Sequence, residues 1–235
     1  MYLQNMFKQK SSWLFILLFL FVAEQSHAQL NYLEKGNKLI YFGIHLGFNQ
    51  GAMKPLRNVS PGSTDSVTFV NSTFGPGFNI GIIGNYQFHK YFDLRLIPTL
   101  SFSDRNLIFR DVNNVEVPKT LSSIYLSFPL MFRYKSKPIK DFRMFVLGGI
   151  RYDFDLSAKS SRRNADDQIL LQTHDVSFET GFGFQFYLPY VILSPEFKVS
   201  HGLINRKFPN ENLIYSRAID KLFSRMFTIS LNLEG

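Results

Sequence analysis

Charged residues of both signs recur at alternate positions in several stretches of the chain. In an extended segment this spacing places them on one face. Acidic and basic groups gathered on one face could relay protons, form an ion path, or pair with one another. The residues concerned are Asp93, Arg95, Arg133, Arg143, Arg151, Asp153, Asp155, Glu179, Glu196 and Lys198.

Three histidines could supply acid–base chemistry, because imidazole is the commonest general acid–base group. His174 precedes Asp175, but adjacent residues of a strand point to opposite faces, so the two are poorly placed to share a proton. His201 is a second candidate at a strand end, and His45 is expected to be a hydrogen-bonded interior residue. We expect no catalytic residue, no metal site and no cofactor, and therefore no enzyme.

The elements that carry these charges show the two-residue alternation of β-strands, with an apolar face opposite a polar or small one. Aromatic residues make up 16% of the chain and include 26 Phe, many of which fall on the apolar faces. The alternating segments are 40–48, 78–88, 92–102, 124–134, 142–156, 176–188, 191–199 and 227–233. Pro98, Pro129 and Pro195 interrupt three of them, where we expect bulges.

The connections between these segments alternate in length. The long ones are 49–77, 103–123, 157–175 and 200–225, and the short ones are 89–91, 135–141 and 189–190. Long loops on one side, with short turns and both termini on the other, are typical of outer-membrane barrels. The sequence therefore predicts an all-β fold: an eight-stranded antiparallel transmembrane β-barrel with short periplasmic turns and long extracellular loops.

A barrel of eight strands has an interior just wide enough to be filled by side chains. We therefore expect the alternating charges to pair inside it as a structural lattice rather than to form an open path. Absence of cysteine excludes disulfides, thiolate catalysis and cysteine-bound metals.

Basic residues outnumber acidic ones, 26 to 18, for a net charge of +8. Several fall in the long connections, where they could meet lipopolysaccharide phosphates or a partner protein, or simply be solvated. These residues are Arg105, Arg110, Lys119, Arg162, Arg163, Arg206, Lys207 and Arg217. We expect outer-membrane lipid and lipopolysaccharide as partners, and no nucleic acid.

Residues 125–134 read YLSFPLMFRY: an aliphatic residue, a proline, further aliphatic residues, a basic residue and a tyrosine. In this pattern the chain resembles the PorT-like outer-membrane β-barrel family. Residues 77–102 and 148–150 also match the family's style, and the likeness covers about 39–233. The resemblance implies a component of the type IX secretion machinery, associated in some organisms with gliding motility, that binds other secretion-machinery proteins. A general barrel for adhesion, lipid contact or envelope integrity, or an outer-membrane hydrolase, are the alternatives.

The first residues predict export. Lys8 and Lys10 precede an apolar run over 13–23, followed by the small-residue pattern at 26–28. The run is about half of the roughly 20 residues that a membrane-spanning helix needs. We therefore assign 1–28 to a cleaved signal peptide and 29–235 to the outer-membrane barrel domain.

We predict that the mature protein begins at Gln29, because cleavage follows the small residue Ala28. Intact-mass measurement of protein isolated from outer membranes checks this. A mass that still includes the apolar run 13–23 would contradict it.

Overall fold

The computed structural model describes residues 38–57, 67–111, 116–157, 171–207 and 219–235. The predicted signal peptide lies outside these residues. The strands are β1 (Ile40–Arg57), β2 (Val67–His89), β3 (Phe92–Leu96), β4 (Thr99–Asp111), β5 (Glu116–Lys135), β6 (Phe142–Asp155), β7 (His174–Tyr187), β8 (Ile192–Gly202) and β9 (Ile219–Glu234). No helix in the described ranges is long and apolar enough to cross a membrane.

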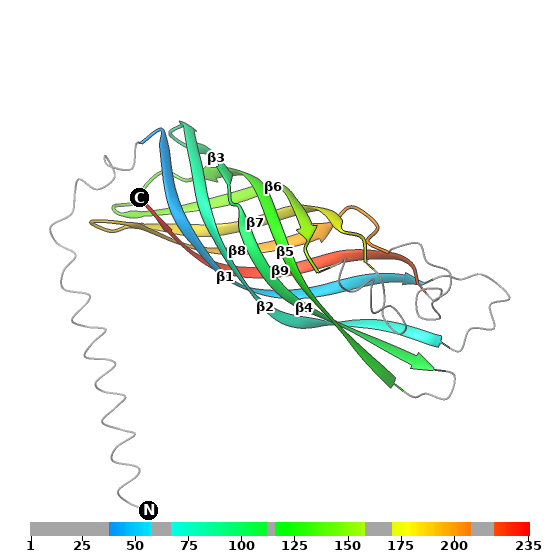
Figure 1. Cartoon of the computed structure of the whole chain (residues 1–235). Coiled ribbons are helices and arrows are strands. Elements are labelled where there is room, and N and C mark those ends of the chain that lie inside the picture. The colour runs from blue at the N-terminus through cyan, green and yellow to red at the C-terminus, as the bar shows by residue number, and fades with distance from the viewer. Residues whose placement is uncertain (1–37, 58–66, 112–115, 158–170, 208–218) are drawn as a thin grey trace, which may run out of the picture.

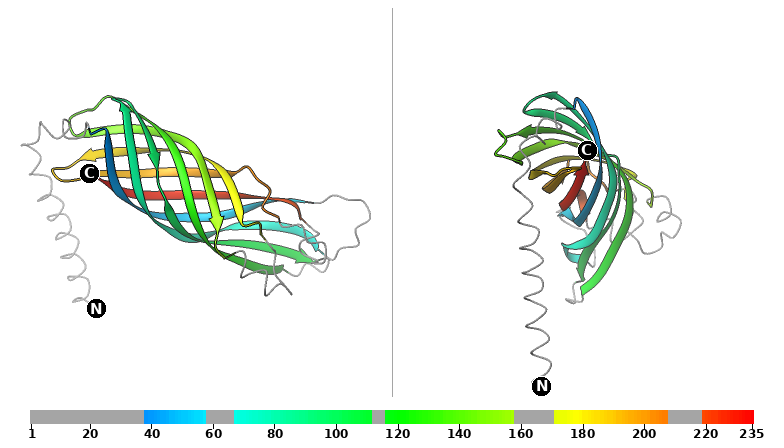
Figure 2. Two further views of the ribbon diagram at one scale, coloured as in Figure 1. Left: turned by 45° about the horizontal axis from the view of Figure 1, so that its top comes forward. Right: turned by 90° about the vertical axis from the view of Figure 1, so that its left-hand side faces the viewer.

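These strands close into a ring in which all neighbours are antiparallel. The first strand, β1, pairs with both β2 and β9, and the remaining strands pair in sequence order around the circumference. Because β3 and β4 occupy one position between β2 and β5, the barrel has eight strands around it. Figures 1 and 2 show the strands tilted and the last strand lying beside the first. The predicted fold is confirmed.

The break between β3 and β4 lies at Ile97 and Pro98, opposite Pro129 of β5. The prediction of a bulge is wrong there, because Leu96 pairs with Leu130 and Thr99 with Ser127, so the register of pairing with β5 is the same on both sides of the break. Pro98 and Pro129 each lack the backbone N–H donor, but the carbonyl oxygen of each still accepts a backbone hydrogen bond. Ile82 donates to the Pro98 carbonyl at 3.0 Å and Ile97 to that of Pro129 at 3.1 Å.

The side chains are arranged inside out relative to a soluble domain. Apolar residues face outward around the barrel, as Phe42 (65% exposed), Ile82 (66%) and Phe182 (51%) illustrate. Polar residues alternate with them and are buried inside, as at Asn49 and Gln185. A continuous apolar exterior around a closed sheet is what a lipid bilayer requires.

Two of the predicted long loops are mostly strand. The hairpin of β1 and β2 continues past the expected strand end at 48, with Gly51 paired to Gly75, and β4 and β5 stay paired as far as Arg110 and Glu116. Beyond Gly51 and Gly75, β1 stays paired with β9 and β2 with β4. The strands β2, β4 and β5 therefore extend beyond their neighbours at the long-loop end of the barrel (Figure 1). Alternation fades there because an outward face beyond the bilayer no longer needs to be apolar.

Aromatic rings gather at the opposite end, where the turns are short. The ring of Phe92 lies 5.4 Å from Phe132 and 5.1 Å from Tyr134, and Phe88 stacks on it at 6.3 Å. Such a cluster is typical of the girdle at a membrane interface. Tyr187, at the same end of the barrel, instead points inward and is buried.

We predict that Phe182→Arg destabilises the barrel by about 2 to 4 kcal/mol, because it places a charge in the middle of the apolar exterior. It also removes the stacking of Phe182 on Phe197, whose ring centroids are 5.3 Å apart. Urea unfolding in lipid vesicles measures the change. Ser122→Arg, at an exposed position beyond the apolar residues of β5, is the control and should change stability little. Equal losses in the two variants would contradict the orientation.

Candidate functional site

The barrel interior is the site that the sequence analysis identified, and the structure shows where each charge lies. All ten of the alternating charged residues are buried inside the barrel: Asp93, Arg95, Arg133, Arg143, Arg151, Asp153, Asp155, Glu179, Glu196 and Lys198. They come from β3, β5, β6, β7 and β8, whose inward positions alternate with apolar outward ones.

In the half of the interior nearest the short turns, Asp93 holds two cations. Arg133 Nη2 lies 2.5 Å from Asp93 Oδ2, and Lys135 Nζ lies 2.8 Å from Asp93 Oδ1. Arg133 also donates to the hydroxyl of Tyr41 and reaches Glu234 at 3.5 Å. Arg133 therefore bridges strands β1, β3 and β9 from its own position on β5.

The lattice continues without a break through the middle of the barrel. Arg95 donates to Glu234 at 2.5 Å and to Glu196. Lys198 lies 3.8 Å from Glu196 and 3.5 Å from Glu179. The two residues that Arg95 joins, on β8 and β9, lie across the interior from β3, so these contacts connect opposite walls.

Two further arginines complete the lattice toward the long-loop end. Arg151 pairs with Asp153 at 3.0 Å and with Glu179 at 3.5 Å. Arg206 comes from the segment after β8, enters the barrel, and pairs with Asp155 at 3.0 Å and Asp175 at 3.5 Å. The segment carrying Arg206 is held by backbone hydrogen bonds to Gln172 and Leu222.

A small apolar cluster lies beside the charges. Met131, Phe145 and Leu147 are buried against one another inside the barrel. The guanidinium of Arg133 lies over the Phe145 ring, 4.9 Å from its centroid. This cation–π contact offsets part of the cost of burying the arginine.

The interior is nearly neutral and nearly full. Eight basic and seven acidic side chains are buried among the described residues: Arg95, Arg105, Arg133, Lys135, Arg143, Arg151, Lys198 and Arg206 against Asp93, Asp153, Asp155, Asp175, Glu179, Glu196 and Glu234. A cavity beside His45 and Thr228 measures about 20 Å³, room for about one water molecule. Such an interior offers neither a wide path nor a strong field of one sign.

Two of the basic residues expected in the outer loops are interior residues. Arg105 of β4 is buried, donates to the Tyr125 hydroxyl and lies over its ring at 4.6 Å. Arg206 is buried as described above. Arg105 was misplaced because β4 continues past the expected strand end, and its odd-numbered residues still face inward. Arg206 lies outside any strand, so no alternating pattern could predict its inward position.

The remaining loop residues lie as follows. Lys207 is partly exposed, and Arg110 and Lys119 belong to the paired strands β4 and β5. Arg162, Arg163 and Arg217 lie outside the described residues.

Lys135 and Glu234 are lattice members that the sequence reasoning missed. Each lies two residues beyond an assigned inward position, Arg133 and Asn232, so extending the alternation by one step would have found them. Glu234 is the more consequential omission, because it forms ion pairs with both Arg95 and Arg133.

The histidines do not assemble a catalytic group. His174 is exposed, with its Nδ1 2.6 Å from the Tyr152 hydroxyl, while Asp175 points inward to Arg206 and Ser224. His201 is exposed, and His45 hydrogen-bonds Asn232 inside the barrel at 2.6 Å. Within the described ranges, no three His, Asp or Glu side chains converge to hold a metal ion.

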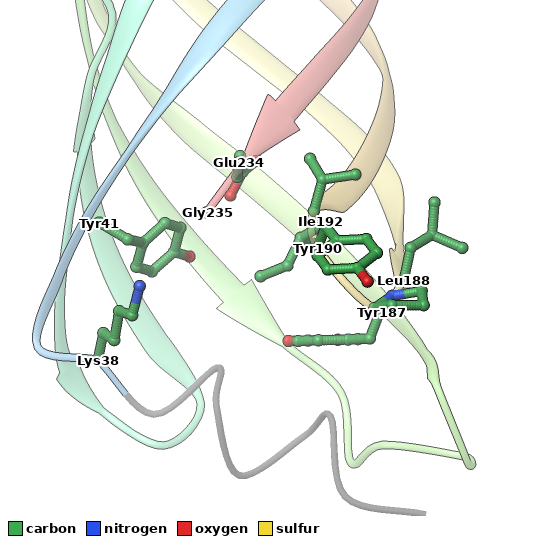
Figure 3. A pocket seen from close by; sticks show the side chains of 10 residues that line it. Lys38, Tyr41, Tyr187, Leu188, Tyr190, Ile192, Glu234 and Gly235 are labelled. Carbon is green, nitrogen blue, oxygen red and sulfur yellow. The ribbon is translucent and has the colours of Figure 1, made fainter. Parts of the chain in front are cut away.

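The short-turn mouth of the barrel is hollowed by a cavity of about 410 Å³ (Figure 3). Tyr41, Tyr187 and Glu234 line it from the barrel wall, and Lys38 and Tyr190 stand at its edge. Glu234 and Tyr41 are also part of the ion lattice, so the cavity ends at the lattice. It is a recess in the mouth and not the entrance of a channel.

We predict that Arg133→Met lowers the free energy of unfolding by about 3 to 5 kcal/mol, because it leaves Asp93 and Glu234 buried with fewer partners. Urea unfolding of the folded barrel in lipid vesicles measures the loss. Lys137→Met, at an exposed turn position, is the control and should change stability by no more than about 0.5 kcal/mol. If Arg133→Met were as stable as the control, the lattice would not hold the barrel together.

Three solved structures resemble this barrel at low sequence identity. OprG of Pseudomonas aeruginosa shares 12% identity with a TM-score of 0.46, the match covering 83% of this chain and 94% of that one. Neisserial surface protein A shares 9% identity with a TM-score of 0.43, over 83% and 97% of the two chains. Ail of Yersinia pestis, in complex with the heparin analogue sucrose octasulfate, shares 11% identity with a TM-score of 0.36, over 84% and 100%. Nothing about function follows from likenesses of this size.

None of the curated proteins compared with this chain matches it in sequence. A family model does match. Residues 24–207, more than half of the chain, fit the model described as an outer membrane protein beta-barrel domain. The closed sheet, its apolar exterior and its charged interior agree with that match. The chain belongs to the family of outer-membrane β-barrel proteins.

Proposed function

We propose that this outer-membrane barrel serves protein export by the type IX secretion machinery as a non-enzymatic component that binds partner proteins. We infer that the barrel is not itself the conduit for secreted proteins. The supporting observation is the filled interior, where ion pairs run from Lys135 to Asp153 and the mid-barrel cavity is about 20 Å³. A secreted protein would need this lattice to open. Its contribution to export is therefore made through its surfaces.

Three surfaces are available for such contacts. The extended ribbon of β2, β4 and β5 projects at the long-loop end. The short turns, including Ser136–Asp141, and the recess beside Tyr190 face the other side. The apolar wall can meet other membrane proteins directly.

The link to type IX secretion rests on the resemblance of residues 125–134 to the PorT-like family. In the barrel, this stretch forms the second half of β5 and contributes Met131 to the apolar cluster and Arg133 to the lattice. Its residues thus support a shared architecture of the interior. The assignment to export comes from the family resemblance and needs a genetic test.

A general role in adhesion, lipid contact or envelope integrity is the second candidate. The observation that favours it is the length of the projecting strands: β2 has 23 residues, about twice what a tilted strand needs to cross the hydrocarbon. A paired ridge of this length could present an adhesive surface outside the cell.

We predict that the purified barrel gives no stable conductance in planar bilayers on the nanosiemens scale, because its interior is closed by side chains. Current recording at symmetric salt measures this, with a large porin as the positive control. A stable nanosiemens channel from the monomer would contradict the proposal.

We further predict that deleting the gene abolishes export of type IX substrates while other outer-membrane proteins remain in place. Fractionation and immunoblotting of the secreted substrates measure this, and re-expression of the parent chain should restore export. Normal export with impaired adhesion or increased envelope leakage would favour the second candidate instead.

A further inference from the structure

Four basic side chains face outward on three adjacent strands at the long-loop end of the wall. They are Lys54 of β1, His201 of β8, and Lys221 and Arg225 of β9, and all four are exposed. Among the other described side chains on the long-loop half of the strands, His174 is the only exposed basic one, and it forms a hydrogen bond with Tyr152.

The strand register makes these four residues neighbours. His201 is directly opposite Arg225, so their Cβ atoms lie roughly 5 Å apart. Arg225 is opposite Ala52 and Lys221 is opposite Leu56, so Lys54 lies diagonally between them, within roughly 8 Å of each. We call these four residues the outer basic cluster.

Among the described residues, no ion pair joins the outer basic cluster to an acidic side chain, although the exposed Asp220 is next to Lys221 in the chain. The ion pairs of the described chain are interior ones, and none involves Lys54, Lys221 or Arg225. Like charges on neighbouring strands destabilise a sheet unless an anion neutralises them. Apart from His174, the exposed basic side chains described on the long-loop half of the strands therefore lie on β8, β9 and β1.

A shallow apolar hollow of about 530 Å³, open to the surroundings, lies on these strands and on the neighbouring β2, toward the short turns. Its walls are exposed aliphatic and aromatic side chains: Leu46, Phe48, Phe78, Ile80, Ile229 and Leu231. Its upper edge at Ile229 is four residues from Arg225 along β9, roughly 13 Å. Phe227, exposed and apolar, occupies the outward position between them.

We propose that the outer basic cluster and this hollow together bind a phosphorylated glycolipid of the outer leaflet, namely the lipid A part of lipopolysaccharide. The long-loop end of a barrel faces the cell exterior, where lipid A displays its phosphates. Arg225, Lys54 and Lys221 donate to phosphate oxygens in charge-assisted hydrogen bonds, and His201 adds an N–H donor. The acyl chains lie along the hollow below. The site does not depend on the proposed role in export.

The test compares binding of fluorescent bisphosphorylated lipid A to the full mature barrel and to a triple variant, Lys54→Gln with Lys221→Gln and Arg225→Gln. We expect at least about tenfold weaker binding by the variant, because each cation near an anionic surface contributes to affinity. Dephosphorylated lipid A, which keeps its acyl chains, should bind the parent as weakly as bisphosphorylated lipid A binds the variant. Heat-modifiable migration in semi-native gels verifies that each protein is folded.

A matched control removes three exposed lysines from the short-turn end: Lys38→Gln, Lys90→Gln and Lys137→Gln. It changes the net charge equally and should bind lipid A as the parent does. Three results would overturn the proposal: equal binding of phosphorylated and dephosphorylated lipid A by the parent, an equal loss in the control, or displacement of lipid A by millimolar inorganic phosphate. The last would indicate a site for free phosphate.

Discussion

The pairing of buried charges is the interaction on which this barrel depends. Lipid outside forces the apolar residues outward, so polar residues fill the interior, and a charge there is tolerated only with a partner. Glu234 shows how closely this is tied to closure. It lies at the end of the last strand, beside β1, and forms ion pairs with Arg95 and Arg133 on the opposite wall. The lattice thus fixes the last strand in the position where it closes the ring.

The same lattice determines what the barrel can do. Its members are large and nearly balanced in charge, so the interior neither leaves room for a polypeptide nor selects ions of one sign. Arg206 adds closure at the long-loop end, since a segment outside the strands places its guanidinium between Asp155 and Asp175. Contacts with partner molecules must therefore be made by the outer surfaces of the barrel.

Those surfaces are not alike around the barrel. One side carries the outer basic cluster above an apolar hollow, on β8, β9 and β1. The strands β2, β4 and β5 instead project past their neighbours at the long-loop end. A barrel with a lipid-binding side and a projecting side would be held in one orientation relative to a partner in the same membrane, which suits a component that acts by contact.

The fold class, the strand order and the inward position of nearly all the charges could be predicted from the sequence, because alternation is set by neighbouring residues along the chain. Lys135 and Glu234 were missed, although they lie one step further along the same faces. The strand ends could not be predicted, since alternation weakens where the outward face leaves the bilayer, and Arg105 was misplaced for that reason. Which charges meet could be learned only from the folded barrel. Arg206 reaches Asp155 and Lys54 adjoins Arg225 because the ring closes with one particular register, and that register depends on the packing of all the strands at once.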